Sequence, residues 1–428
     1  MRFELLHPAD QLVMMMNRIY YRGMTTTSGG NLSIKDENGD LWITPSGIDK
    51  GTLTHDDIMQ VKPDGTIIGR HRPSVEYPFH QSVYRCRSDI KAVLHAHSPG
   101  LVSYSIVRQI PPVNLIPNIK LICGNMAIAP YAVPGSELLG DHISAEFSKG
   151  ADVVMLENHG VVIGAQDIFK AFMAFETLET CAWLSIHGRR LGELKPLRAD
   201  LLDVSMKKNV EMDEFEPGVH TSEENALRRD LIKLIHRSYE NGLFTSTQGT
   251  YSARLRDGSF LITPYGMDRK YLEAEDLVLI REGRKEKGKL PSRSVQLHQE
   301  IYDRHSEISS VLVAHPPHIM AFAVTETAFD SRTIPESYLL LRETMKVPFG
   351  TSYREPRKTA GLFSAQTPVL IFENDCVIVT GNTLLNAFDR LEVAEFTAKS
   401  IIASRSLGDI VHIGGGEVED IKKAFHLD

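Results

Sequence analysis

Three histidines in the first half of this sequence have the types and spacing of metal ligands. His95 and His97 are separated by one residue in KAVLHAH, an apolar run typical of a β-strand. Because successive side chains of a strand alternate between its faces, both imidazoles should project from one face and supply half of a divalent metal site. His159 follows a second apolar run, in LENHGVV, where a turn could bring it to the same place. Three imidazoles would leave one coordination position open, as in catalytic zinc sites.

A carboxylate close to these histidines would complete an acid/base site, and Glu76 is the candidate. It follows Pro73 and Ser74 at the expected start of a helix, where a negative charge is favoured electrostatically. A plain helix-terminal charge is the alternative role for Glu76. For His95 and His97 the alternative is two ordinary hydrogen-bonded histidines, because surface strands carry HxH by chance.

Two glycine-containing segments offer a place for an anion. SGGN at residues 28–31 and PSG at residues 45–47 put glycines where backbone N–H groups could approach a phosphate, and Ser74 adds a hydroxyl. Glycine-rich turns are common, so ordinary turn geometry is the alternative.

The second half of the 428-residue sequence repeats the segments of the first half in the same order, at offsets of 216 to 219 residues. A period of this length indicates two copies of a whole domain rather than a solenoid. We expect domains at residues 1–203 and 223–428, joined by a polar linker at 204–222. The matching pairs are WITPSGIDK and LITPYGMDR, RPSVEYPFHQ and LPSRSVQLHQ, AVLHAH and SVLVAH, and LENHG and FENDC.

Each half also predicts the same order of secondary structure. A helix that ends at a glycine comes first, at Gly23 and at Gly242, and a hairpin with an Asn-Gly or Asp-Gly turn follows. In the first half a helix at about residues 76–88, two apolar strands and a closing helix at 168–186 complete the pattern. This order predicts an α/β domain, layered α/β/α, in which helices flank a mainly antiparallel sheet.

The composition predicts a cytoplasmic protein with no nucleic-acid or membrane partner. The formal net charge of −8 argues against a nucleic-acid surface. No apolar run approaches the roughly 18 residues of a membrane helix, and the N-terminus lacks the pattern of a signal peptide. Four widely separated cysteines without a CxxC pair are typical of a reducing compartment.

The ordered motifs SGGN, ITPSG, PSxE, HAH and NHG resemble those of the class II aldolase/adducin family. Its best-known members are the zinc-dependent fuculose phosphate and rhamnulose phosphate aldolases. The resemblance implies His95, His97 and His159 as ligands of zinc, or of manganese, iron or cobalt, and Glu76 as the catalytic acid/base. It implies a substrate-phosphate site at Gly30, Asn31, Ser46, Gly47, Ser74 and Val75.

Two positions depart from the pattern of the aldolases. Val75 stands where the family has a second serine, and it cannot donate a side-chain hydrogen bond. Leu115 occupies the place of a tyrosine between the HxH and APY segments. The absence of this tyrosine bears on the choice of substrate and on stereochemical control.

The resemblance implies a metal-dependent aldolase that cleaves a ketose 1-phosphate to dihydroxyacetone phosphate and an aldehyde through a zinc-stabilised enediolate. Glu76 would move the proton at C3. The alternatives on the same site are a sugar-acid phosphate decarboxylase or a sugar phosphate dehydratase or epimerase, although the epimerases carry Asp at the position of Glu76. A non-catalytic scaffold like adducin is the alternative from another class.

The second half is expected to keep the fold and to lack the metal site. Ser294, Val313 and Asp375 replace Glu76, His95 and His159, and only His315 keeps its place. Family enzymes resemble cyclic tetramers in which a neighbour completes each active site. We therefore expect a homo-oligomer in which two chains form a four-domain ring.

Overall fold

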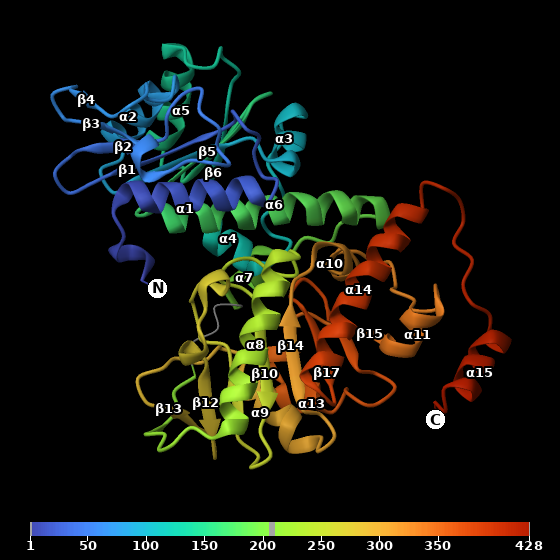
Figure 1. Ribbon diagram of the computed structural model, residues 1–428. Coiled ribbons are helices and arrows are strands. Elements are labelled where there is room, and N and C mark those ends of the chain that lie inside the picture. Colours follow the sequence, from blue (N-terminus) through green and yellow to red (C-terminus); the bar gives the residue numbers. More distant parts are fainter. Residues whose placement is uncertain (1, 205–209, 428) are drawn as a thin grey trace. The chain divides into compact units, whose positions relative to one another are not determined.

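The computed structural model describes residues 2–204 and 210–427 (Figure 1). The chain divides into two compact units. The first unit comprises Met1–Val113 and Asn118–Trp183, and the second comprises Asn114–Pro117 and Leu184–Asp428. Each unit contains one β-sheet with helices, so the predicted α/β class is confirmed.

The sheet of the first unit has eight strands in the order β4-β3-β2-β1-β5-β8-β7-β6. All neighbours are antiparallel except β6 and β7, as the mainly antiparallel prediction requires. This order puts β5, which carries His95, between β1 and β8. The strands are β1 (Asn31–Lys35), β2 (Leu41–Ile43), β3 (Met59–Val61), β4 (Ile67–Ile68), β5 (Ala92–Ala96), β6 (Met126–Ala129), β7 (Val153–Leu156) and β8 (Gly160–Ala165).

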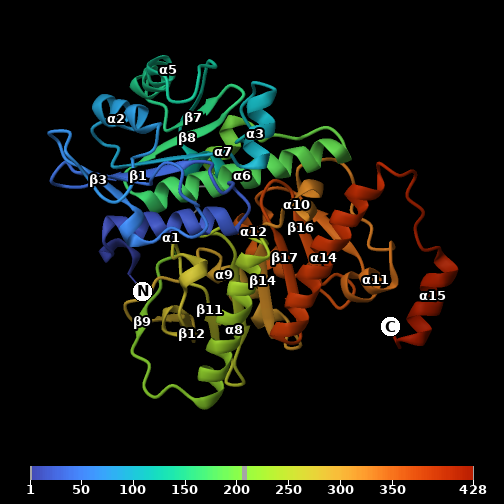
Figure 2. The ribbon, with the colours of Figure 1, turned by 45° about the horizontal axis from the view of Figure 1, so that its top comes forward.

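Helices cover both faces of this sheet. α2 (Tyr77–Cys86) and α5 (Glu137–Ser148) lie on one face, and α1 (Pro8–Tyr21) and α6 (Ile168–Leu191) lie on the other (Figures 1 and 2). α3 (Pro99–Ile106) follows β5 directly. The layered arrangement therefore encloses the sheet as the sequence pattern predicted.

The core between α2, α5 and the sheet fixes the orientation of β5. Phe79 and Val83 of α2 and Phe147 of α5 pack there against Val93 of β5, and all four are at most 2% exposed. Each such side chain contributes about 1.5–3 kcal/mol through burial. Because side chains alternate along a strand, His95 lies on the same face as Val93, where its ring meets the ring of Phe79.

The sheet of the second unit repeats this order with one additional strand, β15-β16-β17-β14-β10-β11-β12-β13-β9. The register is repeated as well, since Asn31 pairs with His95 in the first sheet and Thr250 pairs with Val313 in the second. The internal duplication is thus present in the fold. The strands are β9 (Glu214–Phe215), β10 (Thr250–Arg254), β11 (Phe260–Ile262), β12 (Val278–Arg281), β13 (Arg284–Glu286), β14 (Ser310–Ala314), β15 (Thr344–Val347), β16 (Val369–Phe372) and β17 (Val377–Gly381).

The helices of the second unit also repeat those of the first. α8 and α14 correspond to α1 and α6, and α9 corresponds to α2. The helices are α8 (Ser222–Glu240), α9 (Val295–Arg304), α10 (Pro317–Ala323), α11 (Pro335–Leu341), α12 (Thr351–Arg354), α13 (Pro356–Ala360), α14 (Leu384–Ser404) and α15 (Gly415–Ala424).

A buried carboxylate holds the segment that follows the central strand in each unit. Glu179 of α6 accepts hydrogen bonds from the Ser98 hydroxyl and from the backbone N–H groups of Gly100 and Leu101. Glu395 of α14 binds the N-terminus of α10 in the same way. In the first unit these bonds fix the backbone immediately after His97.

The predicted linker at residues 204–222 contains ordered structure. Glu214–Phe215 forms β9, which pairs in parallel with β13. Residues 205–209 of this linker lie outside the described residues, and the predicted domain limits, 1–203 and 223–428, stay a prediction. No helix among the described residues is long and apolar enough to span a membrane.

Candidate metal centre

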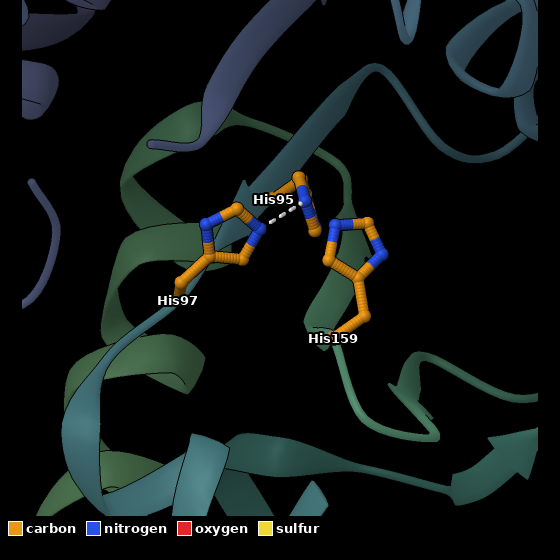
Figure 3. A group of neighbouring side chains, drawn as sticks. All are labelled: His95, His97 and His159. Atoms are coloured by element: carbon orange, nitrogen blue, oxygen red, sulfur yellow. Dashed lines mark hydrogen bonds between the residues drawn. The ribbon is translucent and has the colours of Figure 1, made fainter. Parts of the chain in front are cut away.

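The three histidines meet at one end of the sheet although His159 is far from the others in sequence. His95 lies on β5, His97 directly follows it, and His159 lies in the turn between β7 and β8 (Figure 3). The ring centroids are 4.6, 4.9 and 4.9 Å apart. One nitrogen of each ring lies within 4.8 Å of the others, so the group can hold a metal ion. The adjacency of β5 and β8 produces this convergence.

A hydrogen bond to the backbone sets the tautomer of His95. Its Nδ1 lies 2.9 Å from the carbonyl of Val161, which can only accept, so Nδ1 carries the proton. Nε2 is left with a lone pair and lies 2.9 Å from Nε2 of His97. A metal-binding imidazole typically donates its other N–H to such a carbonyl, so the donor set fits a bound cation.

Burial keeps the rings neutral, as metal ligation requires. It lowers the pKa of His95 and of His97 to about 3, and the neighbouring imidazoles add to the effect. Burial also lowers the pKa of His159, against the opposing effect of the Glu76 carboxylate. All three side chains can therefore offer lone pairs at pH 7.

The turn that carries His159 is held by α3. Asn158 adopts a left-handed conformation with φ of +54°, and Asn374 repeats it in the second unit with φ of +52°. The backbone N–H of His159 donates to the Ser105 hydroxyl at 2.8 Å. Nδ1 of His159 is buried and has no hydrogen-bond partner among the described residues. Unpaired buried groups are uncommon in folded proteins and are consistent with a ligand site.

Glu76 lies beside the histidines at the N-terminal end of α2. It is the residue that precedes Tyr77–Cys86, as expected, and it is 6% exposed. Its Oε2 is 3.3 Å from Nε2 of His95, and its Oε1 is 3.6 Å from Nε2 of His159. Oε1 is buried without a hydrogen-bond partner among the described residues. One carboxylate oxygen is therefore available for a ligand.

A chain of hydrogen bonds that the sequence did not suggest holds Glu76 in place. Asn31 donates from Nδ2 to Oε2 of Glu76 at 2.7 Å, and its Oδ1 accepts from Nε2 of His80 at 2.5 Å. Nδ1 of His80, neutral because burial lowers its pKa, then accepts from the hydroxyl of Ser33 at 2.6 Å. Tyr84 bonds to the same hydroxyl at 2.7 Å. The chain orients the Asn31 amide and so the carboxylate.

The second unit keeps part of this chain of hydrogen bonds but lacks the link that Asn31 provides in the first unit. Ser252 bonds to His298 and Tyr302, each at 2.6 Å, as Ser33 bonds to His80 and Tyr84. Thr250 replaces Asn31, and Nε2 of His298 is left without a partner among the described residues. The repeated histidine was the sequence signal that could have identified His80 as part of the network.

Replacing His80 by phenylalanine should lower turnover about 10- to 100-fold while the metal content stays unchanged. The ring volume is kept, but Asn31 loses its donor and no longer fixes Glu76. His298→Phe is the matched control, because its Nε2 has no partner in the described part of the chain, so its loss should leave turnover at the wild-type level. Steady-state kinetics with metal analysis of both variants test this. Equal losses in both variants would show that the network acts only on stability.

The predicted phosphate-binding residues lie in three segments, at Gly30-Asn31, Ser46-Gly47 and Ser74-Val75. Gly30 and Gly47 have φ of +73° and +71°, and the backbone N–H groups of Gly30, Gly47 and Val75 have no acceptor among the described residues. A side chain on Gly30 would place Cβ 2.7 Å from the carbonyl of His95, so this turn requires glycine. Three such N–H groups can bind an anion.

The other predicted residues of this group have different surroundings. The Ser74 hydroxyl accepts from the backbone N–H of Glu76 at 3.3 Å, and the amide of Asn31 is used by Glu76. Ser46 donates its backbone N–H to Arg72, while Val75 is 67% exposed. Their roles in substrate binding stay predictions.

Lys50 is a cation behind these turns that the sequence did not single out. It is 3% exposed, and its Nζ donates to the carbonyl of Pro45 at 2.6 Å. No carboxylate lies within ion-pair distance of it among the described residues, and burial lowers its pKa to about 8. Arg269 at the matching position of the second unit is the signal that could have identified it.

His7, Asp10 and His55 form a second group with metal-ligand chemistry in the first unit. Its side chains are already paired. Nδ1 of His7 accepts from the backbone N–H of Ala9, and Nδ1 of His55 bonds to Asp10 at 2.9 Å. This group is more exposed, so it fits a metal less well than the three histidines.

Residues 10–186 and 229–402 each match the family described as Class II Aldolase and Adducin N-terminal domain. A 5-deoxy-D-ribulose 1-phosphate aldolase of Bacillus thuringiensis serovar kurstaki is 33% identical over 204 residues, 46% of this chain and 93% of the relative. A 3-oxo-tetronate 4-phosphate decarboxylase of Haemophilus influenzae is 30% identical over 43% of this chain and 90% of the relative. An L-fuculose phosphate aldolase of Methanocaldococcus jannaschii is 32% identical over 41% of this chain and 94% of the relative.

Proposed function

Because the chain belongs to the class II aldolase and adducin family, with the domain present twice, we propose that it is a metal-dependent lyase of sugar phosphates. The proposed reaction is the cleavage of a ketose 1-phosphate between C3 and C4 to dihydroxyacetone phosphate and an aldehyde. One observation carries the proposal: three neutral imidazoles and the Glu76 carboxylate converge at one place in the first unit.

The three histidines would hold the metal, and zinc is the ion that we expect. When bound there, a divalent ion supplies a Lewis acid for the negative charge that develops on the substrate oxygens. The protein contributes the orientation of the ligands. Val161 fixes the ring of His95, and Ser105 fixes the backbone of His159.

Glu76 would move the protons of the reaction. Oε1 of Glu76 would take the proton of the C4 hydroxyl as the C3–C4 bond breaks and the electron pair passes to the C3 side, and it would then return that proton to C3. Among the described residues Oε1 of Glu76 has no hydrogen-bond partner, so it is the carboxylate oxygen positioned to move that proton. Asn31 donates to Oε2 at 2.7 Å and so orients the carboxylate.

The two glycine turns would bind the substrate phosphate. The N–H groups of Gly30, Gly47 and Val75 have no acceptor within the described ranges, and the buried Lys50 adds a positive charge behind the turns. Because Gly30 lies against the backbone of His95, a phosphate there would set the distance from substrate to the histidines. Ser46 and Ser74 supply hydroxyls at the edges of the site.

Decarboxylation of a phosphorylated 3-oxo acid is the second candidate. The similarity to the Haemophilus influenzae decarboxylase, 30% identity over 90% of that protein, favours it, as does Leu115 at the place of an aldolase tyrosine. Both reactions leave an electron pair beside a carbonyl and need a proton delivered there, so Glu76 and the three histidines would have the same roles.

A substrate panel tests the proposal. Zinc-loaded protein is incubated with ketose 1-phosphates and with phosphorylated 3-oxo acids, and the release of dihydroxyacetone phosphate and of carbon dioxide is measured with and without a chelator. We expect chelator-sensitive release of dihydroxyacetone phosphate. Carbon dioxide as the only product would establish the second candidate, and no product from either class would contradict both.

A further inference from the structure

The second unit keeps the anion-binding turns of the first although its metal-site residues have changed. Gly249 and Gly266 have φ of +78° and +72°, and they repeat the left-handed conformations of Gly30 and Gly47. The N–H groups of Gly249 and Gly266 have no acceptor among the described residues. The described residues of this unit contain no group that could hold a metal ion. Metal binding therefore does not explain why both turns are retained.

A buried arginine lies behind these turns. Arg269, 2% exposed, donates to the carbonyl of Gly249 at 3.0 and 3.2 Å and to that of Met267 at 2.8 Å. Its hydrogen bonds go to carbonyls only, and Asp268 acts on it only electrostatically. A guanidinium buried without a bonded carboxylate leaves positive charge beside the turns, which favours an anion there.

A second arginine adds charge that the first unit lacks. Arg293 occupies the position of Val75, and Tyr265 occupies that of Ser46. The guanidinium of Arg293 lies 5.0 Å from the centre of the Tyr265 ring, and this contact restrains it next to Gly266. Arginine binds phosphate through two parallel N–H bonds, so the substitution strengthens the anion site.

A cavity of about 200 Å³ adjoins Arg293 at the positions that the side chains of Glu76 and His95 take in the first unit. Val313 and Ser294, at the positions of His95 and Glu76, both line it. Its other polar groups come from Gln296, Ser352 and Tyr353. The volume is below the roughly 300 Å³ at which pockets for drug-sized ligands begin, so only a small ligand fits.

Hydroxyl groups connect this cavity with the glycine turns. The hydroxyl oxygen of Ser292 lies 3.1 Å from that of Ser294 and 2.7 Å from that of Thr250. Thr250 directly follows Gly249. A ligand that spans the cavity and the turns would thus have hydroxyl partners for its part in the cavity. Its other end would meet the N–H groups and the positive charge at the turns. This order matches a short polyol that carries one phosphate.

We propose that the second unit binds the phosphate ester of a small sugar or polyol without a metal. The phosphate lies at Gly249, Gly266 and Arg293, and the hydroxyl-bearing carbons lie in the cavity beside Ser294. No carboxylate replaces Glu76 and only one of the three histidines remains, so the site binds its ligand without cleaving it. The site does not depend on the activity proposed for the first unit.

Titration calorimetry on the full-length metal-loaded protein tests this with glycerol 3-phosphate, which has no carbonyl to react. We expect two sites per chain. In Arg293→Met one of them should weaken at least about 10-fold, the loss of a charge-assisted contact. Ser294→Leu, which fills the cavity, should weaken the same site. Turnover should stay at the wild-type level in both variants, because neither residue touches the proposed catalytic groups.

Arg256→Met removes an exposed arginine of the same unit and is the control for lost surface charge. Thermal unfolding midpoints show whether each variant is folded. If the first unit binds no phosphate, the wild type should show a single site, and Arg293→Met should weaken it. That result would contradict the function proposed for the first unit but not the binding site proposed for the second. Wild-type binding by both Arg293→Met and Ser294→Leu would overturn the proposal.

Discussion

Replacing His97 by alanine is expected to abolish both the bound metal and turnover. The change removes one of three neutral imidazoles, and two cannot hold the ion against solvent. Loss of a Lewis acid worth several kcal/mol corresponds to a fall in kcat/KM of about 1,000-fold or more. Metal content by mass spectrometry and the rate with the best substrate measure the effect. His97 is the better target because it is half-buried, whereas His95 is fully buried and packs against Phe79.

The matched control for this variant lies in the second unit. His315 follows β14 as His97 follows β5, but its neighbours at the other two ligand positions are Val313 and Asp375. His315→Ala should keep one metal per chain and the wild-type rate. If both variants lost metal to the same extent, the account of a single site in the first unit would be wrong.

Replacing Glu76 by glutamine should lower turnover about 100- to 10,000-fold and leave the metal bound. Glutamine keeps the size and can still bond to Asn31, but it cannot accept and return a proton at the position of Oε1. The sharpest readout is the exchange of the C3 proton of dihydroxyacetone phosphate with deuterated water, which isolates the proton transfer from cleavage. Exchange and cleavage should fall together.

Glu157→Gln serves as the control for this second variant. Its carboxylate also lies near the histidine turn, where it accepts the backbone N–H of Tyr131 at 3.2 Å and lies 3.5 Å from Arg108. Removing its charge should change the exchange rate little. Full deuterium exchange in Glu76→Gln would show that another group is the acid/base and would contradict the proposed mechanism.

Much of the fold followed from repeated local patterns. The glycine stops at Gly23 and Gly242 and the alternating segments predicted the helices and hairpins in both units. The family, predicted from the order of the motifs, is confirmed by the matches to both halves of the chain. The helices and hairpins depend on residues close together in sequence, which is why periodicity and turn residues were sufficient to predict them.

Long-range pairing could not be predicted in the same way. The sequence placed His159 near a turn, but only the sheet order, with β8 beside β5, shows that the turn returns to the HxH strand. The network behind Glu76 was missed because His80 and Ser33 lie on different elements and read separately as ordinary polar residues. Lys50 was missed because its burial depends on the packing of two turns.

The segment Glu214–Phe215 illustrates a different limit. Its two residues are too few to show strand periodicity, and its polar, acidic surroundings are typical of a linker. The structure pairs it with β13, where Glu214 lies 2.9 Å from Lys285 and Phe215 lies under the guanidinium of Arg281. Partners distant in sequence make this short strand.

Anomalous X-ray diffraction from crystals grown with zinc would examine the convergence of the three imidazoles most directly. We expect one strong metal peak per chain, with nitrogens of His95, His97 and His159 about 2.0–2.1 Å away. A peak beside His7, Asp10 and His55 with none between the three histidines would contradict the account, and so would a zinc ion bound at His315.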